Sequence, residues 1–382
     1  MKRYLCLLLV IAFIMCAITF PAHATEFTDN ITAKSALLMD AATGKVLFEY
    51  NADVALPPAS VTKIMTLLLV FEAIDRGTLA LSDMISASEN AASMGGTQIY
   101  LEPGEQMSAE DLIKSVVISS ANDAACALAE HIAGSESAFV TKMNNRAAEL
   151  GMNSTHFENT NGLDDTAENH VTSARDIAIM SRELMKHEKI FDYTTIWMDT
   201  VRGGEFGLSN TNRLLRTYNG CTGLKTGSTA KAKFCISATA KRGELSLIAV
   251  VMGAPTRDER NELAAKLLDF GFANYAVFSD NDSKLNDIAL VGGTKKAIAI
   301  RKNGYSALVE KGSVSKIEAV TELPESISAP VKKGDVVGTV TYKCGDTVLG
   351  KVDIVADEDA EKIGFFDLLY RILRYMICSP EN

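Results

Sequence analysis

Hydrophobic residues switch between strand spacing and helical spacing from Ala36 to about Tyr275, which predicts a domain of mixed α and β structure. Two alternating runs at residues 36–40 and 45–50 flank a turn at Ala42-Thr43-Gly44 and predict a hairpin. After Pro57-Pro58, apolar residues at helical spacing predict a helix that begins at or near Ser60 and stops at Gly77. The same patterns predict helices at residues 109–117, 123–133, 138–150, 173–186 and 257–270, and adjacent antiparallel strands at 233–240 and 245–252.

The pattern changes beyond about Val277. Helical spacing disappears, and short alternating runs at residues 297–300, 336–342 and 348–355 are separated by Gly, Lys and Asp turns. We therefore expect a larger domain at residues 25–276, followed by a small all-β domain at residues 277–358.

The last segment has helical spacing again. Asp367, Arg371 and Arg374 share one face, whereas the apolar residues share another: Phe365, Phe366, Leu369, Ile372, Leu373 and Met376. The segment is too short to span a bilayer, and its aromatic and basic residues favour an amphipathic helix, within residues 359–382, that lies in the membrane surface. The alternative is a terminal helix that packs on the protein's own core or on a second subunit.

The first residues have the pattern of a secretion signal. Lys2 and Arg3 precede an apolar run at residues 4–20, and the small-x-small sequence Ala22-His23-Ala24 follows. This pattern predicts a cleaved signal peptide at residues 1–24 and a protein secreted across the cytoplasmic membrane. A transmembrane anchor is the alternative, but the run is shorter than the ~20 residues that span a bilayer.

Composition excludes several classes of function. The formal net charge of −10 argues against nucleic acid as a partner. No Gly-x-Ser-x-Gly elbow, phosphate-binding loop or HExxH pattern is present, and we expect no metal and no cofactor. The four histidines after the signal are well separated, which argues against a metal site. The cysteines after the signal are odd in number and form no CxxC pair, so we expect buried thiols and neither a disulfide framework nor a zinc site. These cysteines are Cys126, Cys221, Cys235, Cys344 and Cys378.

Candidate chemistry begins with the motif Ser60-Val61-Thr62-Lys63. Ser-x-x-Lys occurs three times, also from Ser228 and from Ser313, but only the first copy opens an apolar helix. Positions i and i+3 of a helix lie on one face, so the Lys63 amine is expected to reach the Ser60 hydroxyl. A serine hydroxyl needs a base to become a nucleophile, and a buried lysine near another cation is partly neutral and can serve.

Two further motifs follow in the chain. Ser120-Ala121-Asn122 lies between two apolar helical stretches. Its side chains are expected to face a cleft, to cap the helix that begins at Asp123, or to do both. Lys225-Thr226-Gly227 lies just before the paired strands, and its alternative role is a hairpin turn that uses Gly227. Each motif alone is weak, but the ordered set is the signature of penicillin-binding proteins and class A β-lactamases.

The set suits the hydrolysis of a peptide with a free C-terminus. Ser60 would attack the carbonyl, with Lys63 and Ser120 relaying its proton. Asn122 would hold the substrate amide, and Lys225 with Thr226 would hold the terminal carboxylate. The oxyanion would bind the backbone N–H groups of Ser60 and of Ser228, on the strand after Gly227.

With its terminal signal and tail, its three motifs and the sequence Phe157-Glu158-Asn159-Thr160-Asn161-Gly162-Leu163, the chain resembles the low-molecular-mass penicillin-binding proteins, which are serine D-alanyl-D-alanine carboxypeptidases. The resemblance implies an α/β (α+β) catalytic domain with a mainly antiparallel sheet and an inserted all-helical lobe, Ser60 as nucleophile, Lys63 as proton acceptor, Ser120 as third active-site residue and Lys225 as substrate binder. It also implies peptidoglycan stem peptides as substrates, release of the terminal D-alanine from an acyl-enzyme, and acylation by β-lactam antibiotics.

Two alternatives remain to be weighed. A class A β-lactamase uses a Glu-x-x-x-Asn loop for deacylation, but here Glu158 is followed four residues later by Gly162, which makes rapid β-lactam hydrolysis unexpected. A non-catalytic module that only recognises cell wall is the second alternative, and the intact motif positions argue against it.

Overall fold

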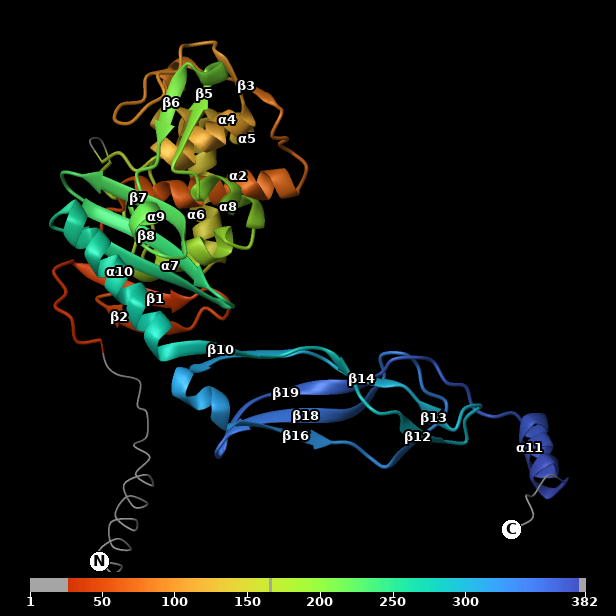
Figure 1. Ribbon diagram of the computed structural model, residues 1–382. Coiled ribbons are helices and arrows are strands. Elements are labelled where there is room, and N and C mark those ends of the chain that lie inside the picture. Colours follow the sequence, from red (N-terminus) through yellow and green to blue (C-terminus); the bar gives the residue numbers. More distant parts are fainter. Residues whose placement is uncertain (1–26, 165–166, 378–382) are drawn as a thin grey trace, which may run out of the picture. The chain divides into compact units, whose positions relative to one another are not determined.

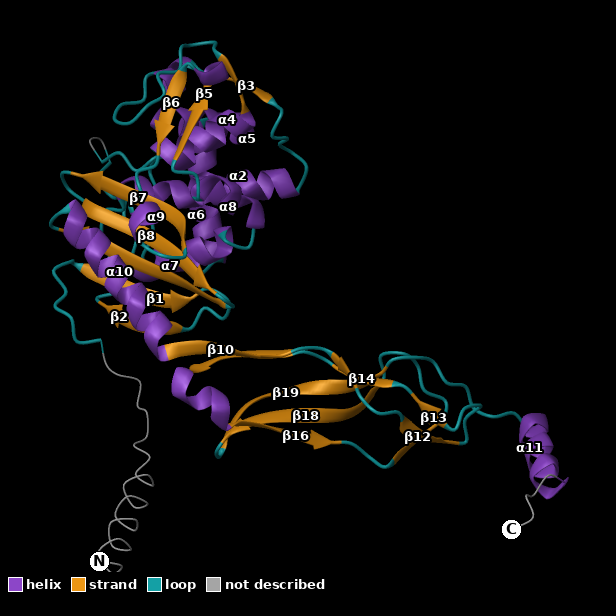
Figure 2. Cartoon of the chain, viewed as in Figure 1, coloured by secondary structure: helices purple, strands orange, loops and turns teal. Residues whose placement is uncertain are grey.

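The computed structural model describes residues 27–164 and 167–377, so the predicted signal peptide at residues 1–24 and Cys378 lie outside the described residues. The chain divides into two compact units, one of which ends at Ala273 while the other begins at Asn274 (Figure 1). The first unit combines helices and strands, and the second is built mainly from strands (Figure 2). The expected fold class, a mixed domain followed by an all-β region, is confirmed.

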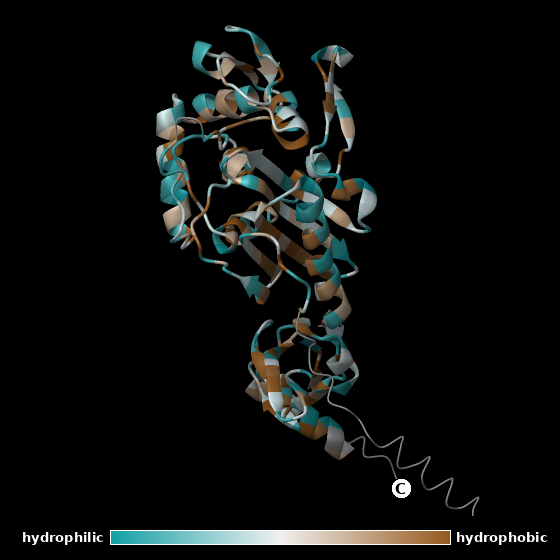
Figure 3. Ribbon diagram, turned by 90° about the vertical axis from the view of Figure 1, so that its left-hand side faces the viewer, coloured by the Kyte–Doolittle hydropathy of each residue, from teal (hydrophilic) through white to brown (hydrophobic). Residues whose placement is uncertain are grey.

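A five-stranded antiparallel sheet forms the centre of the first unit. Its order is β2-β1-β9-β8-β7, and it contains both predicted strand pairs. The strands are β1 (Ser35–Asp40), β2 (Val46–Tyr50), β7 (Cys221–Thr229), β8 (Lys233–Arg242) and β9 (Leu245–Ala254). β1 and β9 are mostly hydrophobic, and both of their faces are buried. Hydrophobic segments of the chain are brown in Figure 3. Helices cover the two faces: α7 (Ala174–Leu184) packs on β1 and β9, and α10 (Arg257–Asn274) places Gly271 against Leu38 and Leu247.

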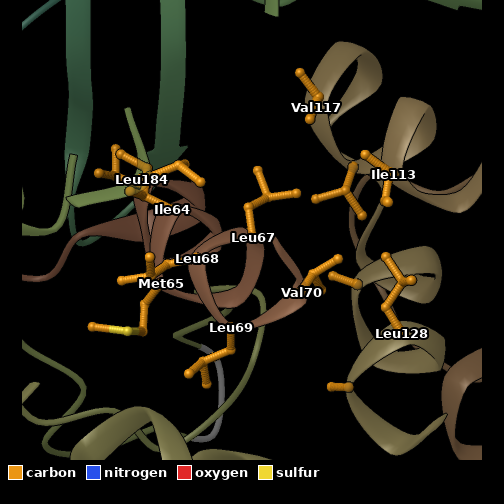
Figure 4. Packing of buried hydrophobic residues seen from close by; sticks show 14 of the residues in the cluster. Ile64, Met65, Leu67, Leu68, Leu69, Val70, Ile113, Val117, Leu128 and Leu184 are labelled. Carbon is orange, nitrogen blue, oxygen red and sulfur yellow. The ribbon is translucent and has the colours of Figure 1, made fainter. Parts of the chain in front are cut away.

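The helix α2 (Lys63–Asp75) runs through the core of the first unit and follows a short 3-10 turn at Ala59–Thr62. Nearly all of its side chains are buried, and they pack against Leu184 of α7 on one side and Ile113, Val117 and Leu128 of the helical lobe on the other (Figure 4). The α-helix therefore begins at Lys63, and Ser60 lies in the turn just before it.

The expectation of an all-helical lobe between α2 and β7 is wrong, because the lobe also carries short hairpins. Its main helices are α4 (Ala109–Lys114), α5 (Asn122–Ala133) and α6 (Glu136–Glu149), and a π-turn at Ser115–Ser119 lies between α4 and α5. The hairpins are formed by β3 (Met84–Ser86) with β4 (Gln106–Ser108) and by β5 (Met198–Val201) with β6 (Phe206–Ser209). Strands of three or four residues are too short to leave an alternating pattern that the sequence would reveal.

The second unit has a hydrophobic core of its own. The ring of Tyr342 is fully buried in it and stacks on Tyr305, with ring centroids 4.2 Å apart. One strand pair is β10 (Tyr275–Asp280) with β15 (Tyr305–Glu310), and the two sheets have the orders β11-β14-β19-β18-β16 and β13-β12-β17. Their strands are β11 (Ser283–Lys284), β12 (Ile288–Val291), β13 (Ala297–Ile298), β14 (Ile300–Lys302), β16 (Ile317–Glu322), β17 (Ser326–Ser328), β18 (Val336–Cys344) and β19 (Thr347–Ala356).

The last described element is the helix α11 (Phe365–Ile377). Its aromatic residues Phe365 and Phe366 are 73% and 82% exposed. The Arg371 guanidinium donates hydrogen bonds to the backbone carbonyls of Gly293 and Thr294. Across residues 27–164 and 167–377, every helix is too short or too polar to cross a membrane.

Candidate active site

Ser60 and Lys63 lie side by side at the start of α2. The 3-10 turn and the first turn of the helix place them on one face, with 3.0 Å between Lys63 Nζ and Ser60 Oγ. The i, i+3 spacing of the motif therefore produces the contact that the sequence predicted.

Lys63 is fully buried and is surrounded by hydrogen-bond acceptors. Its Nζ lies 2.5 Å from Asn122 Oδ1 and 2.9 Å from the backbone carbonyl oxygen of Asn161. Burial, and then the positive charge of Lys225, lower the pKa of Lys63 well below its ordinary value, while Asp123 opposes the shift. Both effects favour the neutral amine over the charged form.

The neutral amine has two N–H groups and one lone pair. Carbonyl oxygens can only accept hydrogen bonds, so the oxygens of Asn122 and Asn161 take the two N–H groups. The Asn122 amide is oriented for this role because its Nδ2 donates to the Gly95 carbonyl at 2.7 Å. The lone pair of the neutral amine would then face Ser60 Oγ, which is the geometry that a general base needs.

Ser120 and Asn122 face the site and do not cap α5. The N-cap position of that helix is Ala121, which makes no side-chain capping bond. Ser120 has left-handed backbone angles, with φ of 69°, and its hydroxyl lies 2.9 Å from Lys225 Nζ. The expected role as a helix cap is therefore wrong, and Asn122 contacts Lys63 directly.

Lys225, Thr226, Gly227 and Ser228 all lie within β7, the edge strand of the sheet. The alternative reading of the motif as a hairpin turn is therefore wrong, as is the expectation that Ser228 lies on a separate, later strand. β7 passes so close to the turn of Ser60 that a Cβ on Gly227 would lie 2.8 Å from the backbone nitrogen of Ser60. Close approach of two backbones explains the glycine at this position.

Lys225 is a second buried lysine in the site, with only 1% of its surface exposed. Its Nζ donates to Ser120 Oγ and, at 3.0 Å, to the carbonyl of Thr226. Burial, and then the charge of Arg260, lower the pKa of Lys225 to about 7. Lys225 is therefore mostly protonated below neutral pH, and its protonated fraction falls as the pH rises above neutral.

A cavity of about 410 Å³ opens in front of these residues. Its walls include Ser60, Ser120, Thr226, Gly227 and Ser228, whereas Lys63, Asn122 and Lys225 lie behind its surface. The remaining residues that line the cavity were not predicted from the sequence: Thr97, Trp197, Ser209, Asn210, Thr211, Arg213, Arg257 and Arg260. One signal was available for the last two, because arginines in the first turn of a helix oppose the helix dipole and need a reason for being there.

The segment of residues 157–163 supports the site from behind α2. Gly162 has φ of 87° and lies against the carbonyl of Ala59, where any side chain would overlap. His170 accepts the Glu158 N–H at Nδ1 and contacts Thr62 Oγ1 at Nε2, and burial lowers its pKa to about 4. His170 is therefore a neutral structural residue, as expected for the histidines.

Glu158 does not reach the cavity. Its side chain is exposed, and Oε1 accepts the backbone N–H of Asn169 at 3.1 Å. Among residues 27–164 and 167–377, no group of three His, Cys, Asp or Glu side chains is placed to hold a metal ion.

Comparison with known proteins identifies similar sequences and structures. The family model described as D-alanyl-D-alanine carboxypeptidase, peptidase S11, matches residues 22–256, and the model described as penicillin-binding protein 5, C-terminal domain, matches residues 272–362. The D-alanyl-D-alanine carboxypeptidase DacF of Bacillus subtilis is 43% identical over 348 residues, which cover 89% of each chain.

Two crystal structures extend the comparison to the fold. Penicillin-binding protein 5 from Haemophilus influenzae superposes with a TM-score of 0.72 and 30% identity, covering 88% of this chain and 100% of that chain. Penicillin-binding protein D2 from Listeria monocytogenes, in its ampicillin-bound form, has a TM-score of 0.59 and 32% identity, covering 65% of this chain and 100% of that one.

Proposed function

The chain belongs to the peptidase S11 family of D-alanyl-D-alanine carboxypeptidases, and we propose that Ser60 is the nucleophile of its reaction. The protein is a serine-type carboxypeptidase of the extracytoplasmic cell wall, which removes the terminal D-alanine of peptidoglycan stem peptides and binds penicillin covalently.

In the acylation step, Ser60 Oγ attacks the carbonyl of the penultimate D-alanine while its proton moves to Lys63 Nζ. The backbone N–H groups of Ser60 and Ser228 donate to the oxyanion of the tetrahedral intermediate. The proton then passes through Ser120 to the nitrogen of the departing D-alanine, the peptide C–N bond breaks, and an ester to Ser60 remains. The observation that carries this proposal is the hydrogen bonding of Lys63, which leaves the amine lone pair for the Ser60 proton.

The free carboxylate of the substrate would bind at the cationic end of the cavity. Thr226, Arg213 and Arg260 line the cavity, and the Lys225 amine lies directly behind its surface, next to Ser120. Charged donors give strong hydrogen bonds to a carboxylate in such a buried place. A requirement for a free C-terminus, which distinguishes a carboxypeptidase from an endopeptidase, follows.

Water would hydrolyse the ester in the second step, with Lys63 again accepting a proton. A β-lactam would also form an ester with Ser60. Its ring-opened amine stays attached to the acyl group, so no small group departs, and Glu158 lies away from the cavity. Slow turnover of the penicilloyl-enzyme is expected.

We further propose that residues 1–24 are a cleaved signal peptide, that residues 25–276 form the catalytic domain and 277–358 the β domain, and that residues 359–382 attach the enzyme to the membrane surface. The exposed apolar side chains of α11, among them Phe366 and Leu369, support the attachment. Sedimentation with anionic lipid vesicles tests it. The mature chain should bind, and a chain ending at Glu361 or carrying Phe366→Asp should not; equal sedimentation of all three would refute the attachment.

Release of D-alanine from a peptide ending in D-Ala-D-Ala tests the role of Ser60. Ser60→Ala should abolish release, because no ester can form. Ser313→Ala is the matched control, since Ser313 and Lys316 repeat the motif in a 3-10 turn of the second unit. D-alanine release by Ser60→Ala, or its loss in Ser313→Ala, would refute the assignment.

A further inference from the structure

Lys63 depends on a backbone carbonyl that no catalytic motif contains. Of its three hydrogen-bond partners, Ser60 and Asn122 are motif side chains, and the third is the carbonyl oxygen of Asn161 at 2.9 Å. If this oxygen moved away, one N–H of the neutral amine would have no acceptor and could turn toward Ser60. The direction of the lone pair therefore depends on what holds the backbone at Thr160 and Asn161 in place.

Two residues, Thr66 and Glu136, hold Thr160, which directly precedes Asn161. The carbonyl of Thr160 accepts the hydroxyl of Thr66 at 2.5 Å, one helical turn beyond Lys63 on α2. Glu136 Oε1 accepts both the backbone N–H of Thr160, at 3.1 Å, and its hydroxyl, at 2.8 Å. Thr160 and Asn161 are buried, so a lost partner would leave one of their polar groups poorly solvated.

Glu136 comes from a different element than the segment it holds. It is the first residue of α6, and its second oxygen lies 3.5 Å from the Asn90 side-chain nitrogen. A carboxylate is suited to the position because one of its oxygens can accept two donors at once, which the Thr160 N–H and hydroxyl supply.

We propose that Glu136 is a positioning residue that, through Thr160, holds the Asn161 carbonyl against Lys63 and so keeps the amine lone pair directed at Ser60. This inference rests on the proposed role of Lys63 as the base. Glu136 does not line the cavity, and it acts on the proton transfers in which Lys63 is the base. Non-covalent binding of the antibiotic, which uses the cavity walls, does not depend on it.

The test compares Glu136→Ala, Glu136→Gln and the control Glu130→Ala in the mature full-length enzyme. Glu130 lies in the same cluster but accepts from Ser88 and Asn90, which do not belong to the segment of Thr160. Stopped-flow reaction with a fluorescent penicillin separates the acylation rate constant from the binding constant. We expect Glu136→Ala to lower the acylation rate constant by about 10–100-fold, since misplacement by about 1 Å can cost this much, with the binding constant unchanged.

The acylation rate constant of Glu136→Gln should stay within about threefold of the wild-type value, because the amide keeps the Oε1 acceptor through which Glu136 acts. The acylation rate constant of the control Glu130→Ala should stay within the same limits of about threefold. Wild-type acylation by Glu136→Ala, equal losses in Glu136→Gln, or equal losses in Glu130→Ala would each overturn the proposal. Thr160→Val, which removes only the hydroxyl donor, should give an intermediate loss even if Glu136→Ala fails to fold, and a wild-type rate for it would count against the proposal. Failure of the wild type to form a Ser60 ester would instead refute the proposed function.

Discussion

Gly227→Ala is a small substitution that should affect both the fold and the chemistry. The new methyl carbon would lie 2.8 Å from Pro58 O, 2.8 Å from Ser60 N and 2.9 Å from Val61 N. Non-bonded heavy atoms prefer separations of about 3.5–4.0 Å, so β7 must move away from the turn of Ser60 by roughly 0.7 Å or more. All three atoms belong to the backbone, and no flexible side chain can give way.

The expected cost has two parts. Overpacking in a rigid core destabilises by about 1–3 kcal/mol, which for a domain of this size lowers Tm by about 2–4 °C per kcal/mol. The displacement also separates Ser228 and Lys225 from Ser60, and a shift of this order lowers the acylation rate by about 10–100-fold. The control is Gly207→Ala in β6, where a Cβ would meet no atom within 4 Å. Thermal unfolding and acylation by a fluorescent penicillin measure the two effects, and a Gly227→Ala enzyme with wild-type Tm and rate would refute the reasoning.

Three further predictions concern ionisable side chains. Lys63→Arg should slow acylation by about 10²–10⁴-fold in a stopped-flow assay, because guanidinium does not become a neutral base at accessible pH. KM for the D-Ala-D-Ala peptide should rise as the pH increases through about 7, because Lys225 loses its proton there; a flat KM between pH 6 and 9 would contradict the proposed carboxylate site. Glu158→Ala should leave the lifetime of the penicilloyl adduct unchanged in a mass-spectrometric time course, since that carboxylate binds the Asn169 N–H outside the cavity; faster or slower loss of the adduct would show that Glu158 takes part in deacylation.

The sequence predicts those features of the site that depend on local geometry. Ser60 and Lys63 meet because both lie on one helical face, and apolar spacing alone identifies that helix. The large strands β8 and β9 are likewise visible in the sequence, because ten-residue strands have long apolar runs.

Long-range and backbone features of the site leave no such pattern. Lys225 bonds to Ser120 across 105 residues, and the strand that carries it contains Thr and Gly residues that are typical of turns. The reason for Gly227 is a close approach between two chain segments that only the tertiary structure brings together. The acceptor at Asn161 is a main-chain carbonyl, which every residue possesses, so no residue type can reveal it.

The central claim, that Ser60 is the acylated residue, is tested most directly by peptide mapping. The mature protein is incubated with penicillin, digested, and sequenced by tandem mass spectrometry. We expect one penicilloyl adduct, on Ser60, which disappears in Ser60→Ala together with D-alanine release. An adduct on Ser120 or Ser228, or one that persists in Ser60→Ala, would contradict it.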